Sequence, residues 1–298
     1  MAVVKPEVII VPAGRWVRFL NLLKRAFLGA LNDGCFGTAK GVAYSGLLAF
    51  FPVMASLAAI LAQVQADAVS RTISRFLFEV VPTPPAPPGS QDLVHFVFNE
   101  RGQRPIWLLV ASSFLSIWAA TGAILSLMEG FQAAYKLPTG RSILKQRGVA
   151  VLLVFAAAIP ALGASGLMLF GTRTERAIIQ SLHLLPAGEQ LRVWVVVVSR
   201  TIRYVIALSA TVVVTSMLYY FGPNRPMRWR NVWPGAILAT VLWLPATVGF
   251  GWYVGHLANY NVLYGSVAAG IVLLVWMYLL ALIALLGCEF NAERERLG

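Results

Sequence analysis

Two arginines, Arg200 and Arg203, interrupt a long apolar run of the chain. Residues 192–221 read RVWVVVVSRTIRYVIALSATVVVTSMLYYF, which is long enough for a helix to cross a hydrocarbon core about 30 Å thick. A guanidinium group presents its donors in a planar fork that fits phosphate and carboxylate. Our functional hypothesis is therefore that Arg200 and Arg203 face the inside of a helix bundle and bind the anionic group of a ligand.

The same arginines also fit a second interpretation, in which they only anchor the helix at the membrane surface. The helix from Arg200 to Phe221 covers about 32 Å, so that Arg200 falls at the outer interface and can reach the headgroups. On an ideal helix, Arg192, Ser199 and Arg203 lie within about 40° of one direction. Arg200 lies about 60° from Arg203, which completes a basic stripe under either interpretation.

Residue types that could support enzyme chemistry are present but are not arranged for it. The histidines His95, His183 and His256 have no second His, Cys or carboxylate at the spacing of a metal site. The chain contains no G-x-S-x-G elbow and no P-loop, and neither Cys35 nor Cys288 has a nearby histidine to activate it. We expect no catalytic residues, no metal, no cofactor and no disulfide.

The composition is that of an integral membrane protein. Of the 298 residues, 58% are hydrophobic and 12% are charged, whereas about 25% are charged in soluble domains. No segment alternates polar and apolar residues for the roughly ten positions of a transmembrane barrel strand. The sequence therefore predicts an all-α, polytopic membrane protein. All twelve Asp and Glu residues fall in loops or at the ends of spans, which disfavours a carrier with an intramembrane carboxylate.

The domain organisation follows from the apolar windows. A cytoplasmic N-terminus (1–40) precedes one transmembrane domain (41–287), and a cytoplasmic tail (288–298) follows it. Six spanning helices are predicted, and they lie at about 41–64, 105–128, 148–170, 193–221, 232–253 and 264–287. The connection 65–104, with the proline-rich VPTPPAPPGSQD, is a long outer loop that we assign to the periplasm.

Residues 15–28, RWVRFLNLLKRAFL, predict an amphipathic helix at the membrane interface. Arg18 and Arg25 lie opposite its apolar face, which is formed by Trp16, Phe19, Leu20, Leu23 and Phe27. Its basic side would lie among the anionic headgroups of the inner leaflet.

Lysines and arginines predict the orientation of the spans. The connections 1–40, 129–147, 222–231 and 288–298 carry 15 of the 24 Lys and Arg residues, and the opposite connections carry 7. The positive-inside rule then places both termini in the cytoplasm. A bacterial inner membrane and contact with its anionic lipids are the location and partner that we expect.

Two polar clusters are expected near the ends of the spans. Just past the inner end of the last span, Glu289 could pair with Arg225, Arg228 or Arg230, which would fix the inner ends of the helices. At the outer end, NYNVLYGS holds a polar and aromatic cluster, formed by Tyr260, Asn261, Tyr264 and Ser266. This cluster could equally be an ordinary aromatic belt.

Several motifs resemble those of one family. They are AYSGLLAFFPVM in the first span, SIWAATGA in the second, FGPNRPMRWRNVWPGA between spans four and five, and YNVLYGS and LLGCEFNA around the last span. Together they resemble the YihY/BrkB membrane proteins, although Ala49 stands where that family usually has serine and Cys288 where it usually has alanine. The resemblance implies a bacterial inner-membrane protein of a group once labelled ribonuclease BN.

We expect the protein to transport or handle an amphipathic or anionic molecule, lipid among the candidates. The alternative is a scaffold that organises an envelope complex without transport. A cavity lined by polar side chains would favour the first and a fully packed interior the second. The chain offers no metal cluster or acid/base pair for cleaving RNA, so we expect neither nuclease activity nor nucleic-acid binding.

Overall fold

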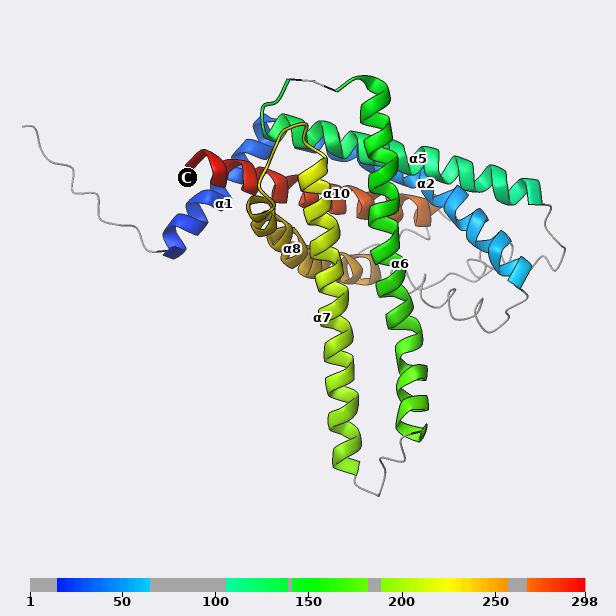
Figure 1. The fold of residues 1–298 in the computed structure, drawn as a ribbon. Coiled ribbons are helices and arrows are strands. Elements are labelled where there is room, and N and C mark those ends of the chain that lie inside the picture. Colours follow the sequence, from blue (N-terminus) through cyan, green and yellow to red (C-terminus); the bar gives the residue numbers. More distant parts are fainter. Residues whose placement is uncertain (1–14, 65–105, 139–140, 182–188, 257–266, 298) are drawn as a thin grey trace, which may run out of the picture.

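The computed structural model describes residues 15–64, 106–138, 141–181, 189–256 and 267–297 (Figure 1). Over these residues the chain forms only helices, which are α1 (Arg15–Asn32), α2 (Cys35–Val64), α5 (Ile106–Ala134), α6 (Ile143–Ser181), α7 (Glu189–Phe221), α8 (Trp229–His256) and α10 (Val267–Leu297). All except α1 are long and apolar enough to cross a membrane. The prediction of an all-α polytopic protein with six spans is therefore confirmed.

All six spanning helices extend past at least one of the boundaries expected from hydropathy, and α2 and α10 show why. Helix α2 begins at Cys35, after a turn in which Gly34 has a φ of 72°, a left-handed conformation that glycine adopts without strain. Helix α10 continues to Leu297, so the segment expected as a tail is helical almost to its end. Cys288, Phe290 and Ala292 are buried there, and this packing extends the helix beyond its most apolar part.

The helices form two groups that meet near one end (Figure 1). Helix α2 packs along α5, and α10 packs against α2, α8 and α1. Small residues permit the close approach of α2 and α5: a Cβ atom on Gly122 would lie 3.6 Å from Ser45 Oγ. Helices α6 and α7 pack against each other as a hairpin that projects away from this group at a steep angle.

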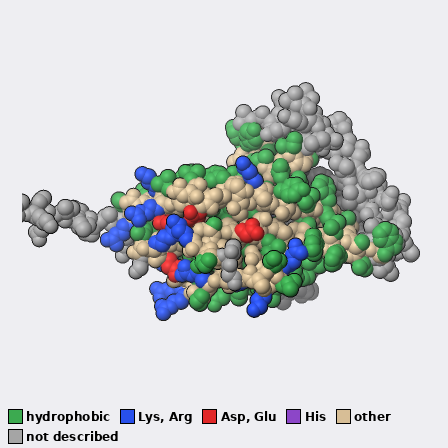
Figure 2. Space-filling model, turned by 90° about the horizontal axis from the view of Figure 1, so that it is seen from above, with side chains coloured by type: hydrophobic (Ala, Val, Ile, Leu, Met, Phe, Trp, Pro, Cys, Tyr) green, Lys and Arg blue, Asp and Glu red, His purple; other side chains and the backbone are tan. Residues whose placement is uncertain are grey.

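The main hydrophobic core lies where the two groups meet. It is built from buried residues that include Ala30, Cys35, Ala39, Phe131, Ala134, Tyr219, Val232, Ala236, Leu285, Cys288 and Ala292. We call the end of the molecule that surrounds this core the basic end. It is formed by α1, residues 135–138 and 141–142, the connection 222–228 and the last turns of α10. Figure 2 shows Lys and Arg side chains gathered where α1 and the C-terminus lie. The charge distribution predicts that this end is cytoplasmic.

Helices α7, α8 and α10 make close contacts at the basic end. The hydroxyl of Tyr219 donates a hydrogen bond of 2.6 Å to the carbonyl oxygen of Ala284. A Cβ atom on Gly235 would lie only 2.0 Å from the carbonyl oxygen of Gly287. The two glycines therefore allow backbone contact between α8 and α10, and this contact fixes the position of the turn that precedes α8.

Candidate functional site

The start of α6 is built to attract an anion. Ser142 directly precedes the helix, and the backbone N–H of Gln146 donates to the Ser142 carbonyl over 3.0 Å, which closes the first turn. The first N–H groups of a helix have no partner within it, and they carry the positive end of its dipole. Lys145 lies in the same turn and is exposed. The helix start therefore combines backbone donors with a full positive charge.

Arg141 brings a second cation to the same place. Its Nε donates to Asn224 Oδ1 over 2.9 Å, and its Nη1 donates to the carbonyl oxygen of Phe221 over 3.1 Å. These bonds tie the connection before α6 to the turn after α7. Because both acceptors are neutral, Arg141 keeps its full charge at the helix start.

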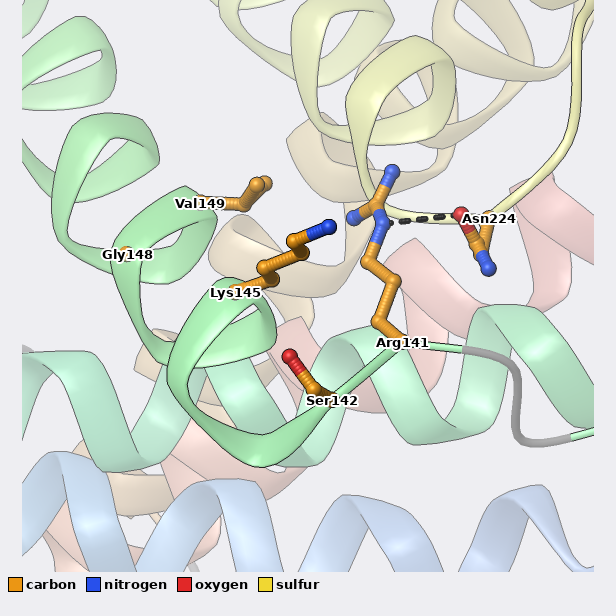
Figure 3. A pocket seen from close by; sticks show the side chains of 6 residues that line it. All are labelled: Arg141, Ser142, Lys145, Gly148, Val149 and Asn224. Carbon is orange, nitrogen blue, oxygen red and sulfur yellow. Dashed lines mark hydrogen bonds between the residues drawn. The ribbon is translucent and has the colours of Figure 1, made fainter.

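These groups surround a cavity of about 550 Å³, shown in Figure 3. It is lined by Arg141, Ser142, Lys145, Gly148, Val149 and Asn224, none of which is acidic. The side chains of Lys145 and Arg141 reach into the same space from two sides (Figure 3). We call this cavity the basic pocket, and its chemistry suits a phosphate or carboxylate.

A third cation lies near the pocket on the same helix. The guanidinium of Arg147 lies over the Trp118 ring of α5, 4.1 Å from the ring centroid. Both residues are exposed, and a cation–π contact at an exposed site contributes about 0.5–1 kcal/mol. The first two turns of α6 therefore present positive charge along a segment that is otherwise apolar enough to enter a membrane.

The arginines that follow α7 do not pair with Glu289. Arg225 forms an ion pair with Glu295 and lies 4.8 Å from the ring centroid of Tyr135. Arg228 and Arg230 are exposed. An ion pair does connect the end of α10 to the α7–α8 turn, but its acidic partner is Glu295 and not Glu289. The extension of α10 brings Glu295 to this turn. Burial raises the pKa of the Tyr135 phenol well above its usual range, so the ring stays neutral beside Arg225.

Glu289, unlike Glu295, is fully buried. The thiol of Cys35 donates to its Oε1 over 3.7 Å, and its Oε2 has no hydrogen-bond partner. The position of Glu289 just past an apolar run suggested a surface ion pair. The sequence could not reveal its burial, because α1 folds back over this face of α10.

Arg200 and Arg203 lie on the same helix but differ in burial. Arg200 is exposed on α7, whereas Arg203 is only 9% exposed and has an interaction partner. Neither lines the basic pocket or the smaller cavity at the basic end. Whether they bind an anion remains a hypothesis. The predicted outer cluster of Tyr260, Asn261, Tyr264 and Ser266 lies outside the described residues, as does the connection 65–104 that we predict to be periplasmic.

Sequence reasoning overlooked the basic pocket itself. Arg141 and Lys145 were visible only as two of the many cations that set the orientation. Their chemical role depends on Asn224, which is far away in the chain and meets Arg141 only when α6 and α7 pair. Among the described residues, no group of three or more His, Cys, Asp and Glu side chains could hold a metal ion.

The six apolar helices define a polytopic α-helical membrane protein. The family described as Virulence factor BrkB matches residues 26–297, and the chain therefore belongs to the BrkB family. The resemblance found from the motifs is confirmed.

Individual relatives include a ribonuclease-like protein, YfkH of Bacillus subtilis (strain 168), which is 28% identical over 92% of this chain and 94% of that protein. UPF0761 membrane proteins match a shorter segment. The one from Tolumonas auensis is 41% identical over 26% of this chain and 25% of that protein. The one from Verminephrobacter eiseniae is 36% identical over 26% of this chain and 18% of that protein. No solved structure matches the chain.

Proposed function

We propose that this BrkB-family membrane protein handles an amphipathic molecule with an anionic group, such as a phospholipid, and that it binds this group in the basic pocket. The observation that carries the proposal is the convergence of Arg141, Lys145 and the start of α6 on a cavity with no acidic lining. Its volume of about 550 Å³ lies within the range of small-molecule sites.

The position of the pocket supports a membrane ligand over a purely soluble one. The basic pocket opens beside Gly148 and Val149, where α6 becomes apolar. Farther along α6, Leu152, Phe155 and Ile159 are exposed, as side chains that face lipid would be. A ligand could therefore place its charged group at Arg141 and Lys145 and its apolar part along α6.

The competing function is that of a non-transporting scaffold at the membrane. The exposed apolar flank of the projecting α6–α7 hairpin favours this alternative, since it could contact another membrane protein. A scaffold does not need the charge of Lys145, so substitution of this residue separates the two functions.

The test measures binding of a short-chain anionic phospholipid to the purified protein in detergent. Lys145→Gln is the cleaner variant, because Arg141 also holds the α7–α8 turn. Loss of one charged hydrogen-bond donor should weaken binding about tenfold or more. Arg228→Gln is the matched control, since Arg228 is exposed on the neighbouring turn and does not line the pocket.

Equal affinity in the native protein and in Lys145→Gln would contradict the proposal, as would equal weakening in Arg228→Gln. Inorganic phosphate serves as a second probe. If phosphate competes fully with the lipid at similar concentration, the pocket recognises a free anion and the lipid part of the proposal is wrong.

A further inference from the structure

A second group of polar atoms is buried at the basic end, apart from the basic pocket. Asp33 lies in the turn between α1 and α2, where its backbone N–H donates to the Gly29 carbonyl over 2.8 Å. Glu289 of α10 packs beneath this turn with an exposed fraction of 0%. Asp33 follows Gly29 by one helical turn, and a Cβ atom on Gly29 would lie 3.0 Å from Glu289 Oε2, so the two carboxyl groups are close enough to interact.

Each of these two carboxyl groups has one oxygen without a hydrogen-bond partner. Glu289 Oε1 accepts from the Cys35 thiol, but Glu289 Oε2 is unpaired, and so is the buried Asp33 Oδ2. Both oxygens are acceptors when the groups are ionised. A buried acceptor without a donor is costly, and two carboxylates in contact also repel each other.

A single proton shared by the two carboxyl groups removes both the cost of the unpaired oxygens and the charge repulsion. If either group is protonated, its hydroxyl donates to the other carboxylate, and the contact becomes a strong charge-assisted hydrogen bond. Cys35 and Cys288, the titratable neighbours from α2 and α10, are buried thiols, and only Cys35 donates to Glu289.

The remaining charged neighbours lie around a cavity of about 270 Å³ over this site. It is lined by Arg25, Lys136, Glu293 and Arg296 together with Asp33. Arg296 is occupied by Glu293 and by the carbonyl oxygen of Ala134, and neither Arg25 nor Lys136 bonds to the unpaired oxygens. Tyr135, at the end of α5, has an unpaired hydroxyl of its own.

The cavity borders the buried carboxyl group of Glu289 through Gly29. Gly29 lines it, and a Cβ atom on Gly29 would lie 3.0 Å from Glu289 Oε2. The unpaired oxygen of Glu289 therefore points at the glycine that forms the wall.

We propose that Asp33 and Glu289 together bind one exchangeable proton, which bridges their carboxyl groups and fastens the α1–α2 turn to α10. The cavity lined by Arg25 and Arg296 is its route to solvent. Release of the proton leaves two negative charges in contact, and this repulsion weakens the packing of α1 on α10. The packing is otherwise carried by Ala26, Ala30 and the contact of Phe19 with Phe290.

Infrared spectroscopy of the purified full-length protein tests the proton directly. The native protein should show the carbonyl band of a protonated carboxyl group, and the band should disappear as the pH is raised. Glu289→Gln and Asp33→Asn should each lose the band, because the new amide donates to the remaining carboxylate and replaces the proton. Both variants keep the shape of the side chain, so they should fold. Glu129→Gln, at an exposed acid on α5, is the control and should retain the band.

Hydrogen exchange of the α1 amides, corrected for the intrinsic effect of pH, tests the consequence. Protection of α1 should fall in the native protein over the same pH interval in which the band is lost. It should be independent of pH in Glu289→Gln. Absence of the band at every pH would overturn the proposal, and so would a band that persists in both amide variants. These readouts do not involve the basic pocket, so they can fail or succeed independently of lipid binding.

Discussion

The side-chain oxygen of Asn291 on α10 accepts a hydrogen bond of 2.7 Å from the backbone N–H of Gly235 on α8. The amide nitrogen of the same side chain donates to the carbonyl oxygen of Val232 over 2.9 Å. Asn291 thus bonds to the backbone on both sides of Pro234, which lies inside the first turns of α8. Proline has no N–H to donate, so it interrupts the helical hydrogen bonding in this turn, and Asn291 adds two side-chain hydrogen bonds from α10 beside the interruption.

Asn291→Ala should therefore destabilise the protein. The substitution leaves a buried N–H and a buried carbonyl with poorer partners, which costs about 1–3 kcal/mol for such a group. Thermal unfolding in detergent measures the loss. Asn21→Ala, at an exposed position of α1, should change the melting temperature little, and equal melting of the two variants would contradict this role.

The glycine contact between α8 and α10 should not accept even one methyl group. In Gly235→Ala, the new Cβ would lie 2.0 Å from the Gly287 carbonyl oxygen, so the helices must separate, at a cost of about 3 kcal/mol or more. Gly249→Ala is the matched control on the same helix, because no heavy atom lies within 4 Å of its Cβ position. We expect low membrane abundance for the first variant and normal abundance for the second.

Arg200 and Arg203 should respond differently to substitution. Arg203→Gln places an uncharged side chain at a buried position and should abolish complementation of a strain that lacks the protein, at normal membrane abundance. Arg200→Gln should have little effect, because Arg200 is exposed and either interface water or headgroups can solvate its replacement. Full complementation by the double variant would show that the arginines only anchor α7 at the interface.

Membrane orientation is testable with single cysteines. Ser90→Cys, in the loop assigned to the periplasm, should react with an impermeant thiol reagent added outside intact spheroplasts, and Ser142→Cys should not. Cys35 and Cys288 are fully buried, so they should not add background labelling and can be left in place. Labelling of only Ser142→Cys would reverse the topology and move the basic pocket to the outer face.

The purified protein should not degrade RNA, with or without Mg²⁺. Among the described residues, no group of three or more His, Cys, Asp and Glu side chains could hold a metal ion, and no acidic side chain or histidine lines the basic pocket. A copurifying nuclease is excluded by testing variants. Activity that follows the protein through purification and is lost in Glu129→Gln would refute this expectation.

The sequence alone was sufficient for the fold class and the number of spans. A spanning helix must satisfy its backbone within itself and hide a long apolar surface, so its signal is local and can be read from consecutive residues. The amphipathic pattern of α1 is local in the same way. The family motifs in FGPNRPMRWRNVWPGA and LLGCEFNA also indicated which connections matter.

Only the tertiary structure decided how these segments meet. Glu289, Asn291 and Glu295 lie within two turns of α10. Asn291 nevertheless bonds to α8, Glu289 accepts from Cys35 at the start of α2, and Glu295 pairs with Arg225. Hydropathy placed all three in a cytoplasmic tail, since polar residues beyond an apolar run look solvated. Likewise, Arg141 reaches Asn224 only because α6 and α7 pair. Such contacts depend on the packing of helices that are distant in sequence, as at the close approach of Gly235 and Gly287. The hydropathy of consecutive residues carries no information about this packing.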